Sequence, residues 1–346
     1  MALKVGVVRD ERFLLHNTGL VHPERPGRLK AVYRMLDKDF VNDLINIEPE
    51  LATLEQLELV HTPGYIRKIL RTAEREFTNL APDTPVSSQS YLAAFLAVGG
   101  CIRGLQALLS GRCDVCFALS RPPGHHALPA RAGGFCIFNN IGVAARYAIE
   151  RHGLSRVLIL DWDIHHGNGI QELFYDQKEV MYLSTHNTGW YPYSGDWNET
   201  GEGVGLGYTV NIPVPKEIGD DDLIYLYATV LLPVLRRFHP ELILVAAGFD
   251  GHHRDPVGRT QLTERSYRGL AELVIELRDA VRSPPVLLVL EGGYDVASLA
   301  VCVKEVLDAL LFKGRRRKVS TAATARGKEL ADKAFGIHSQ YHVWAG

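Results

Sequence analysis

Short apolar runs, each ending in glycine or polar side chains, recur along this chain. The four clearest runs cover 115–119, 157–160, 242–247 and 286–290. Their length and their content of valine, leucine and isoleucine are typical of parallel strands that are buried on both faces. We therefore expect these runs to be buried strands.

Amphipathic segments separate the apolar runs. The segment 140–152 follows an asparagine and stops at Gly153. The segment 220–238 opens on three aspartates and ends before Pro240, and a third segment begins at Thr263. Polar residues at the start and glycine or proline at the end are typical helix boundaries. Strand and helix therefore alternate, which favours a doubly wound α/β fold.

The end of the run 157–160 carries a cluster of metal-ligand side chains. Asp163 and His165 are two residues apart, and extended backbone points such residues to the same side, where they can bind one cation. Asp250 follows the run 242–247. Open α/β sheets bind ligands beyond the carboxyl ends of their strands. Convergence of these ends would give two carboxylates and one imidazole, and a catalytic zinc keeps three such ligands and one open position.

The other two runs would supply the surroundings of that open position. The run 115–119 leads to His125 and His126, and the run 286–290 leads to Tyr294. Taken singly, adjacent histidines are usually surface or capping residues, and a tyrosine can simply lie at a sheet edge. We favour a catalytic site because all four strand ends supply matching side chains.

Five segments at these strand ends resemble the motifs of the histone deacetylase superfamily. They are 121–127, 133–140, 161–169, 248–250 and 291–294. The sequences Asp-Trp-Asp-Ile-His-His-Gly-Asn-Gly and Glu-Gly-Gly-Tyr are similar to the class II branch and its prokaryotic relatives. The resemblance extends from the turn at 22–25 to about Leu310. It implies the arginase/deacetylase fold, a single three-layer α/β/α domain with a central, mainly parallel sheet.

The last segment of the chain differs in composition from the rest. Five of the six residues in 313–318 are lysine or arginine, and a polar stretch follows. We therefore expect a deacetylase catalytic domain over 1–312 and a basic, polar C-terminal tail or extension over 313–346. A solvated tail is the favoured interpretation, and a patch for an acidic partner is the alternative.

The resemblance implies hydrolysis of an amide by metal-activated water, without a covalent intermediate. The implied ion is Zn²⁺, or Fe²⁺ in the cell, and its ligands would be Asp163, His165 and Asp250. His126 is implied as the general base, and His125 as the partner of Asp161, which orients it.

Two further positions refine the implied chemistry. Asn168 occupies the position where the class I pattern has a second aspartate, so it brings no negative charge to His126. His126 should then be less basic than in the aspartate-bearing branch. The hydroxyl of Tyr294 would donate to the oxyanion that forms when water attacks the carbonyl.

The resemblance also assigns the walls of the pocket. Phe135, which follows Gly134, and Tyr191 match the two aromatics that clasp the acyl-lysine methylenes. An ordinary loop aromatic is the alternative for Tyr191. Asp83 could accept substrate N–H groups at the rim. A K⁺ or Na⁺ site is implied as well, formed by Asp161, Asp163, His165, Ser184 and Thr185.

Three substrate hypotheses follow. The first is an Nε-acyl-lysine in a protein or peptide, the second a small acetylated amine such as an acetylpolyamine, and the third an acyl-lysine binder without activity. The polyamine-preferring pattern has Glu where this chain has Val257, which favours acyl-lysine, although Asp255 could compensate. A silent binder would usually lack a metal ligand or Tyr294, and this chain has lost neither. An arginase-like binuclear site is disfavoured because a second metal would need more carboxylates than these motifs provide.

Composition and charge narrow the classes of binding partner and the location that we expect for the protein. The formal net charge of −2 gives no electrostatic argument for direct nucleic-acid or membrane binding. We find no N-terminal signal segment and expect no apolar run near the ~20 residues that span a bilayer. The oligomeric state is left open.

Cysteine usage points to a reducing compartment. The five cysteines are odd in number and scattered, so we expect a cytoplasmic protein without a disulfide framework. Cys113 and Cys116 form a C-x-x-C that enters an apolar run, which favours core cysteines over a redox pair. Cys136 is expected near the pocket as an exposed, oxidisable thiol.

Overall fold

The central element of the protein is an eight-stranded sheet. The computed structural model describes residues 3–311 and 322–344. The strand order is β2-β1-β5-β10-β9-β6-β7-β8, and every neighbouring pair is parallel. The strands are β1 (Val5–Val8), β2 (Ile45–Ile47), β5 (Val115–Ala118), β6 (Val157–Asp161), β7 (Val180–Asn187), β8 (Thr209–Val214), β9 (Leu242–Ala247) and β10 (Val286–Leu290). A separate antiparallel hairpin consists of β3 (Phe77–Ala81) and β4 (Thr84–Ser87).

The four predicted strands are immediate neighbours in this sheet. They are β5, β10, β9 and β6, in that spatial order, and all of their residues are buried. Because parallel strands place their carboxyl ends at the same edge, the four reactive segments that follow them meet there.

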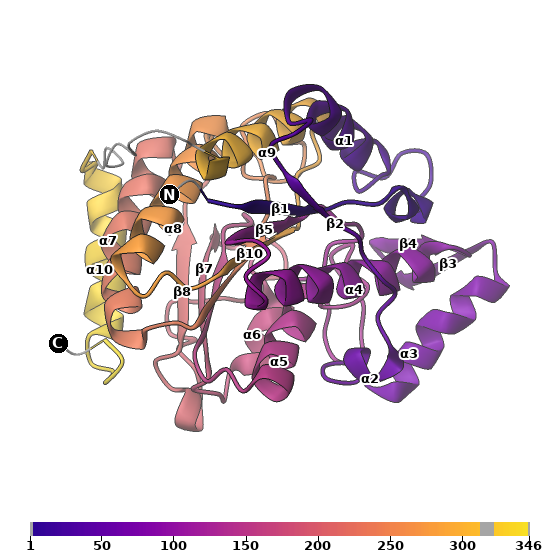
Figure 1. Cartoon of the computed structure of the whole chain (residues 1–346). Helices are drawn as coiled ribbons and strands as arrows, with labels where there is room; N and C mark the ends of the chain where they lie inside the picture. Colours follow the sequence, from indigo (N-terminus) through magenta and orange to yellow (C-terminus); the bar gives the residue numbers. More distant parts are fainter. Residues whose placement is uncertain (1–2, 312–321, 345–346) are drawn as a thin grey trace.

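Helices cover both faces of the sheet, which makes three layers (Figure 1). On one face α9 packs against α1 and α8, and α8 packs against α7; on the other, α5 packs against α4 and α6. The helices are α1 (Gly27–Asp39), α2 (Leu54–Leu57), α3 (Pro63–Leu70), α4 (Ser90–Leu109), α5 (Asn140–His152), α6 (Asn168–Phe174), α7 (Asp220–Phe238), α8 (Glu264–Ala280), α9 (Val296–Leu311) and α10 (Ala325–His338). Short 3₁₀ segments cover Glu11–Leu15, Arg71–Glu74 and Gly203–Gly205. The predicted three-layer α/β/α arrangement is confirmed.

The predicted helix boundaries have identifiable caps. The side chain of Asn139 accepts from the N–H of Gly142 at the start of α5, and Gly153 ends that helix with φ 69°. Glycine takes this left-handed conformation at little cost. Thr263 caps α8 through the N–H of Arg265.

Helix α4 corrects one expectation from the sequence. Its 20 residues are long and apolar enough to cross a membrane, so the expectation that no apolar run approaches this length is wrong. The helix contacts β5, β1 and β10, and 78% of its apolar window is buried inside the protein. This is the composition expected of a helix that packs against the core of a sheet.

The C-terminal segment also differs from expectation. The basic run 313–318 lies outside the described residues, but α10 packs against α7 and β8. Ala331, Ala334 and His338 on this helix are buried, and so is Trp344 beyond it. A solvated tail is therefore wrong for residues 325–344, because Ala331, Ala334 and Trp344 belong to the main hydrophobic core.

All five cysteines are buried and free. Cys113 and Cys116 belong to the core, as predicted. The prediction that Cys136 is an exposed, oxidisable thiol is wrong, because its side chain is completely buried. Burial raises the pKa of the Cys136 thiol well above its usual value, which disfavours the reactive thiolate.

Candidate active site

The predicted metal ligands form a buried cluster. Asp163 and His165 follow β6, Asp250 follows β9, and these strands are paired. The Nδ1 atom of His165 lies 2.8 Å from Oδ2 of Asp250 and 3.2 Å from Oδ1 of Asp163. One ligand atom of each residue lies within 4.8 Å of the others, and all three residues are buried.

The charges of this cluster favour a bound cation. Burial, and then the neighbouring Asp163, raise the pKa of Asp250 to about 7. Although burial opposes a charged imidazole, Asp250 and Asp163 raise the pKa of His165 to about 10. The two carboxylates thus stabilise positive charge at this point, and no lysine or arginine among the described residues forms an ion pair with them. Two carboxylate oxygens and one imidazole nitrogen are a ligand set that suits zinc.

Two glycines allow the backbone to close around the ligands. A Cβ atom on Gly248 would lie 2.0 Å from Oδ2 of Asp163, and one on Gly292 would lie 2.5 Å from Oδ2 of Asp250. The N–H of Gly292 donates to Oδ2 of Asp163 at 2.9 Å. These positions require glycine because the carboxylates occupy the space of a side chain.

The two adjacent histidines have different partners. Nδ1 of His125 lies 3.2 Å from Oδ2 of Asp161, whereas Nδ1 of His126 lies 2.9 Å from Oδ1 of Asn168. Both pairings are those predicted. Because the amide oxygen of Asn168 only accepts, Nδ1 of His126 carries the proton and Nε2 keeps its lone pair.

The different partners give the two imidazoles opposite charge preferences. Although burial opposes the charged form, Asp163 and Asp161 raise the pKa of His125 to about 10. Burial, followed by the charges of His125 and His165, lowers the pKa of His126 well below its usual value. His125 is thus the charged member of the pair, and His126 is neutral with a free lone pair. A neutral imidazole is the form that a general base requires.

Glu291 is a functional residue to which the sequence argument assigned no role. Its Oε2 accepts the N–H of Gly124 at 2.6 Å and the N–H of His125 at 3.1 Å. The carboxylate is completely buried, and burial raises its pKa to about 7. Glu291 therefore fixes the backbone that carries both histidines. The position of Glu291 at the end of β10, next to two glycines, is the feature of the sequence that could have identified it.

A second buried carboxylate connects the N-terminal turn to this region. Glu24 accepts from Arg28 at 2.9 Å and from two nitrogens of Arg121 at 2.5 and 2.6 Å. Arg28 also donates to the carbonyl oxygens of Glu291 and Gly293. All three charged side chains are completely buried, and such groups persist inside a protein only when they are paired.

Tyr294 lies between an aromatic ring and a cation. Its ring centroid is 5.4 Å from that of Phe135 and 4.9 Å from the guanidinium carbon of Arg28. Burial, and then the charge of Asp250, raise the pKa of Tyr294 well above its usual value. The hydroxyl therefore stays protonated and can donate a hydrogen bond.

In the loop after β9, Asp255 was the acidic residue that could compensate for the absence of glutamate at Val257. Asp255 is buried, and its carboxylate accepts the N–H groups of Val257, Tyr294 and Asp295. These bonds hold the loop against the strand end of β10. Asp255 thus positions the backbone of Tyr294.

The predicted wall residues lie near the histidines but contact different partners. The ring of Tyr191 packs edge-on against His126 at 5.0 Å, whereas Phe135 packs against Tyr294. Oδ2 of Asp83 accepts the N–H of Gly134 at 3.1 Å, so Asp83 holds the turn that carries Phe135. A clasp of both rings around a substrate stays a prediction.

The predicted monovalent-cation residues occupy neighbouring strands. Ser184 on β7 is the register partner of Asp161 on β6. Its hydroxyl bonds Nδ1 of His186 at 2.9 Å, and the hydroxyl of Thr185 bonds that of Tyr227 at 3.0 Å. Whether Asp161, Asp163, His165, Ser184 and Thr185 bind K⁺ or Na⁺ stays a prediction.

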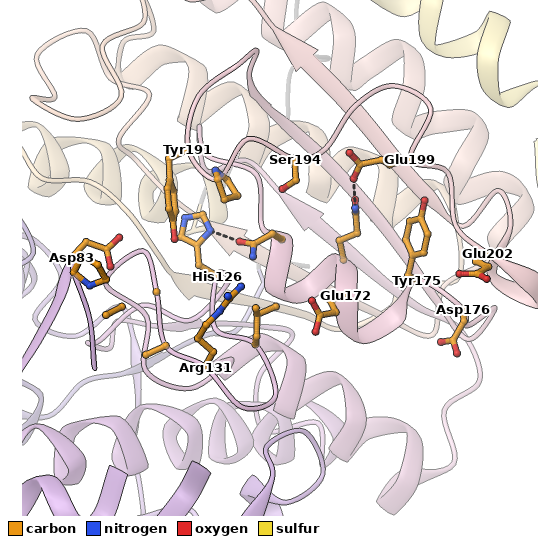
Figure 2. A pocket seen from close by; sticks show the side chains of 18 residues that line it. Asp83, His126, Arg131, Glu172, Tyr175, Asp176, Tyr191, Ser194, Glu199 and Glu202 are labelled. Carbon is orange, nitrogen blue, oxygen red and sulfur yellow. Dashed lines mark hydrogen bonds between the residues drawn. The ribbon is translucent and has the colours of Figure 1, made fainter. Parts of the chain in front are cut away.

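A groove of about 1110 Å³ opens beside the histidines (Figure 2). His126 and Tyr191 line one part of it, and α6 from Asn168 onward, with the residues after it, lines another. In Figure 2, Asp83 lies at one end of the view and Glu202 at the other. The groove therefore reaches His126, whereas the metal ligands and Tyr294 are not among its lining residues.

Comparison with known proteins agrees with this geometry. The histone deacetylase domain family matches residues 22–310. The chain is 37% identical to a probable deacetylase of Archaeoglobus fulgidus over 294 residues, which covers 84% of this chain and 81% of that protein. It is 37% identical over 292 residues to a histone deacetylase-like amidohydrolase of Pseudomonas aeruginosa, covering 84% and 77% of the two chains.

A plant relative extends the similarity to nearly the whole chain. Histone deacetylase 15 of Arabidopsis thaliana is 36% identical over 345 residues, which covers 97% of this chain but 62% of that protein. The crystal structure of the HDA15 HD domain superposes with a TM-score of 0.91 at 34% identity, covering 98% of this chain and 95% of that one. The chain therefore belongs to the histone deacetylase family and is a hydrolase of the deacetylase type.

Proposed function

We propose that this protein is a zinc-dependent deacylase that removes acetyl groups from Nε-acyl-lysine in proteins or peptides. The observation that carries the proposal is the convergence of three kinds of group. A buried ligand cluster, a neutral imidazole with a free Nε2 and a protonated phenol lie at the ends of neighbouring strands. Amide hydrolysis by metal-activated water can use one group of each kind, as Lewis acid ligands, general base and oxyanion donor.

Asp163, His165 and Asp250 would hold the ion, with Fe²⁺ as the alternative in the cell. When bound, the ion supplies Lewis acidity that polarises the amide carbonyl and acidifies the attacking water. His126 accepts the proton of that water at Nε2, while Asn168 holds the proton on Nδ1. His126 then gives the proton to the departing amine nitrogen, so the imidazole returns to its starting form.

The remaining residues of the site stabilise charge. The hydroxyl of Tyr294 donates to the carbonyl oxygen as negative charge develops on it. His125, held by Asp161 and by the backbone bond to Glu291, places a second positive charge near the ligand cluster. Its Nε2 lies 3.9 Å from Oδ1 of Asp163.

Acyl-lysine is favoured over an acetylpolyamine by the loop after β9. The polyamine-preferring pattern places a glutamate where this chain has Val257, and Asp255 is buried and bonded to backbone N–H groups. A silent acyl-lysine binder is disfavoured because the ligands, His126 and Tyr294 are all present. A cytoplasmic location is part of the proposal and rests on the cysteine usage.

The test combines metal analysis with a substrate panel. Purified protein is assayed on one acetyl-lysine peptide, the same peptide with longer acyl groups, and acetylpolyamines. We expect one catalytic divalent ion per chain and the highest kcat/KM on the acetyl-lysine peptide. Preference for the acetylpolyamines would contradict the substrate, and the absence of hydrolysis across the panel would contradict the enzyme.

A further inference from the structure

The loop between β7 and β8 has few side chains to anchor it. This β7–β8 loop covers residues 188–208 and carries Tyr191. Its buried positions are Gly195, Thr200, Gly205 and Gly207. Three of them are glycines, and glycine loses more conformational freedom on ordering than any other residue. The loop therefore depends on bonds to other segments for a fixed conformation.

Glu199 connects the middle of the loop to the active site. Its carboxylate accepts the N–H of Gly195 at 3.1 Å and a hydrogen bond from the side-chain amide of Gln171 on α6. The amide oxygen of Gln171 lies 3.0 Å from Nε2 of His166. Because His166 directly follows the ligand His165, this network links the loop to the chain segment that carries the metal ligands.

Tyr191 is the part of the loop that lies against the catalytic residues. Its ring centroid is 5.0 Å from that of His126. A Cβ atom on Gly134 would lie 3.0 Å from Cε1 of Tyr191, so the ring also lies against the turn before Phe135. Figure 2 shows Tyr191 beside His126, with Glu199 further along the same loop. The position of this wall residue therefore depends on how the loop is held.

The C-terminal segment, residues 325–344, contacts the second half of the loop. The hydroxyl groups of Thr200 and Tyr341 lie 2.9 Å apart. The indole N–H of Trp344 donates to the carbonyl oxygen of Gly207 at 3.2 Å. A Cβ atom on Gly207 would lie 2.6 Å from Cβ of Tyr341, so the tyrosine occupies the space beside this glycine. Two of the four buried positions of the loop are thus held by the C-terminal segment.

The C-terminal segment is itself fixed to the body of the protein. Helix α10 packs against α7 and β8 (Figure 1). Arg326 in its first turn donates to the carboxylate of Asp222 at 3.1 Å. On the side of the loop, the ammonium nitrogen of Lys333 lies 4.4 Å from the ring centroid of Trp197. The segment can therefore act as a fixed support for the loop.

We propose that Tyr341 and Trp344 are positioning residues for substrate binding. By holding Thr200 and Gly207 they keep the β7–β8 loop, and with it Tyr191, in the place where the loop forms a wall for the acyl-lysine. This inference rests on the proposed function. Apparent affinity falls with the fraction of molecules whose binding site is formed. Loss of the support should therefore raise KM, whereas kcat depends on the ligand cluster and the catalytic side chains and should be unchanged.

The first experiment removes the hydrogen bond between the segment and the loop. Tyr341→Phe deletes one hydroxyl and keeps the ring beside Gly207. We expect KM for an acetyl-lysine peptide to rise about fivefold, the size expected for one hydrogen bond, with unchanged kcat and metal content. Thr200→Val should have the same effect, whereas Thr200→Ser keeps the hydroxyl and should leave KM near the wild-type value. The double variant Tyr341→Phe, Thr200→Val should be no worse than either single variant.

The second measurement does not depend on turnover. Within the loop, the N–H of Gly207 donates to the carbonyl oxygen of Thr200 at 2.7 Å, and that of Gly195 donates to Glu199. In Tyr341→Phe these two amides should exchange hydrogen about fivefold faster than in the wild type, because the loop opens more often. The amides of β6 should exchange at the wild-type rate.

A matched control and the outcomes separate this inference from the proposed function. Tyr147→Phe removes a hydroxyl that lies 2.9 Å from the side-chain nitrogen of Gln106, between α5 and α4, and should change neither KM nor loop exchange. If Tyr341→Phe lowers stability but leaves KM and loop exchange unchanged, the segment is merely structural and the inference is overturned, while the deacylase stands. If the wild type hydrolyses no peptide, the proposed function fails, and loop exchange still decides whether Tyr341 holds the loop.

Discussion

The ligand cluster and the groove beside His126 are built in opposite ways. In the cluster, Asp163 and Asp250 are buried, and their oxygens accept backbone N–H groups as well as facing His165. In the groove, Glu172 and Asp176 are exposed and lack such bonds among the described residues. Buried, bonded groups keep one geometry, which a reaction requires. Exposed charges without such bonds keep no single geometry.

The largest expected effect comes from a change in the ligand cluster. Asp250→Ala removes one of three ligands, so both bound metal and hydrolysis should be lost. The loss should exceed the about 10–100-fold typical of changes outside the ligand shell. Metal analysis and kcat/KM are measured on the same preparation. Two tightly bound catalytic ions in the wild type, or full activity after complete chelation, would contradict the site.

Loss of the general base should have the second largest effect on activity. His126→Ala should lower kcat by about 10²- to 10⁴-fold, because proton transfer loses its acceptor. The metal content should be unchanged, since the imidazole bonds Asn168 and not the ligand cluster. A folded variant that has lost its metal would instead identify His126 as a ligand.

Loss of the oxyanion donor should lower activity slightly less than loss of the general base. Tyr294→Phe removes one oxygen and keeps the ring between Phe135 and Arg28, so fold and metal content should persist. We expect kcat to fall about a hundredfold or more with little change in KM. Near-wild-type kcat would remove Tyr294 from the mechanism.

The smallest effect concerns stability and the C-terminal helix. His338 is completely buried, stacks on Trp344 at 5.1 Å, and has no partner for either ring nitrogen among the described residues. Burial lowers its pKa to about 4. In the unfolded chain His338 therefore binds a proton below about pH 6.5, whereas in the folded chain it binds one only below about pH 4. Stability is complete above this window and declines as the pH falls through it.

The variant His338→Phe keeps an aromatic ring without a titrating group. Its free energy of unfolding should depend less on pH between 6.5 and 4 than that of the wild type, by at most about 3 kcal/mol across the window. Denaturant unfolding at several pH values measures the difference. Parallel pH curves for the two proteins would show that His338 does not contribute.

The core of the site could be predicted from the sequence because its signals are local. Each of four apolar runs leads directly into its reactive residues, and the carboxyl ends of parallel strands meet by geometry. The pairing of His126 with Asn168 came from family resemblance and is confirmed. Each of these parts of the site is specified by a short segment of the sequence.

The remaining features depend on residues far apart in the chain. The groove beside His126 combines Asp83 with α6 and with the loop that holds Glu199, and no short pattern marks it. Helix α10 buries mainly small residues such as Ala331 and Ala334, so its sequence shows little apolar periodicity. The burial of Cys136 and Asp255 likewise depends on packing by distant segments. Tertiary contacts, and not local propensity, decide these outcomes.

The ionic contacts of Arg28 couple the catalytic end of the sheet to the N-terminal turn. Its guanidinium bonds Glu24 and the backbone of Glu291 and Gly293, and lies over the ring of Tyr294. Separation of that turn would leave a buried charge unpaired at the active site, which costs several kcal/mol. Partial opening of this region is therefore unfavourable, and on heating the loss of catalysis should coincide with the cooperative unfolding transition of the whole domain instead of preceding it.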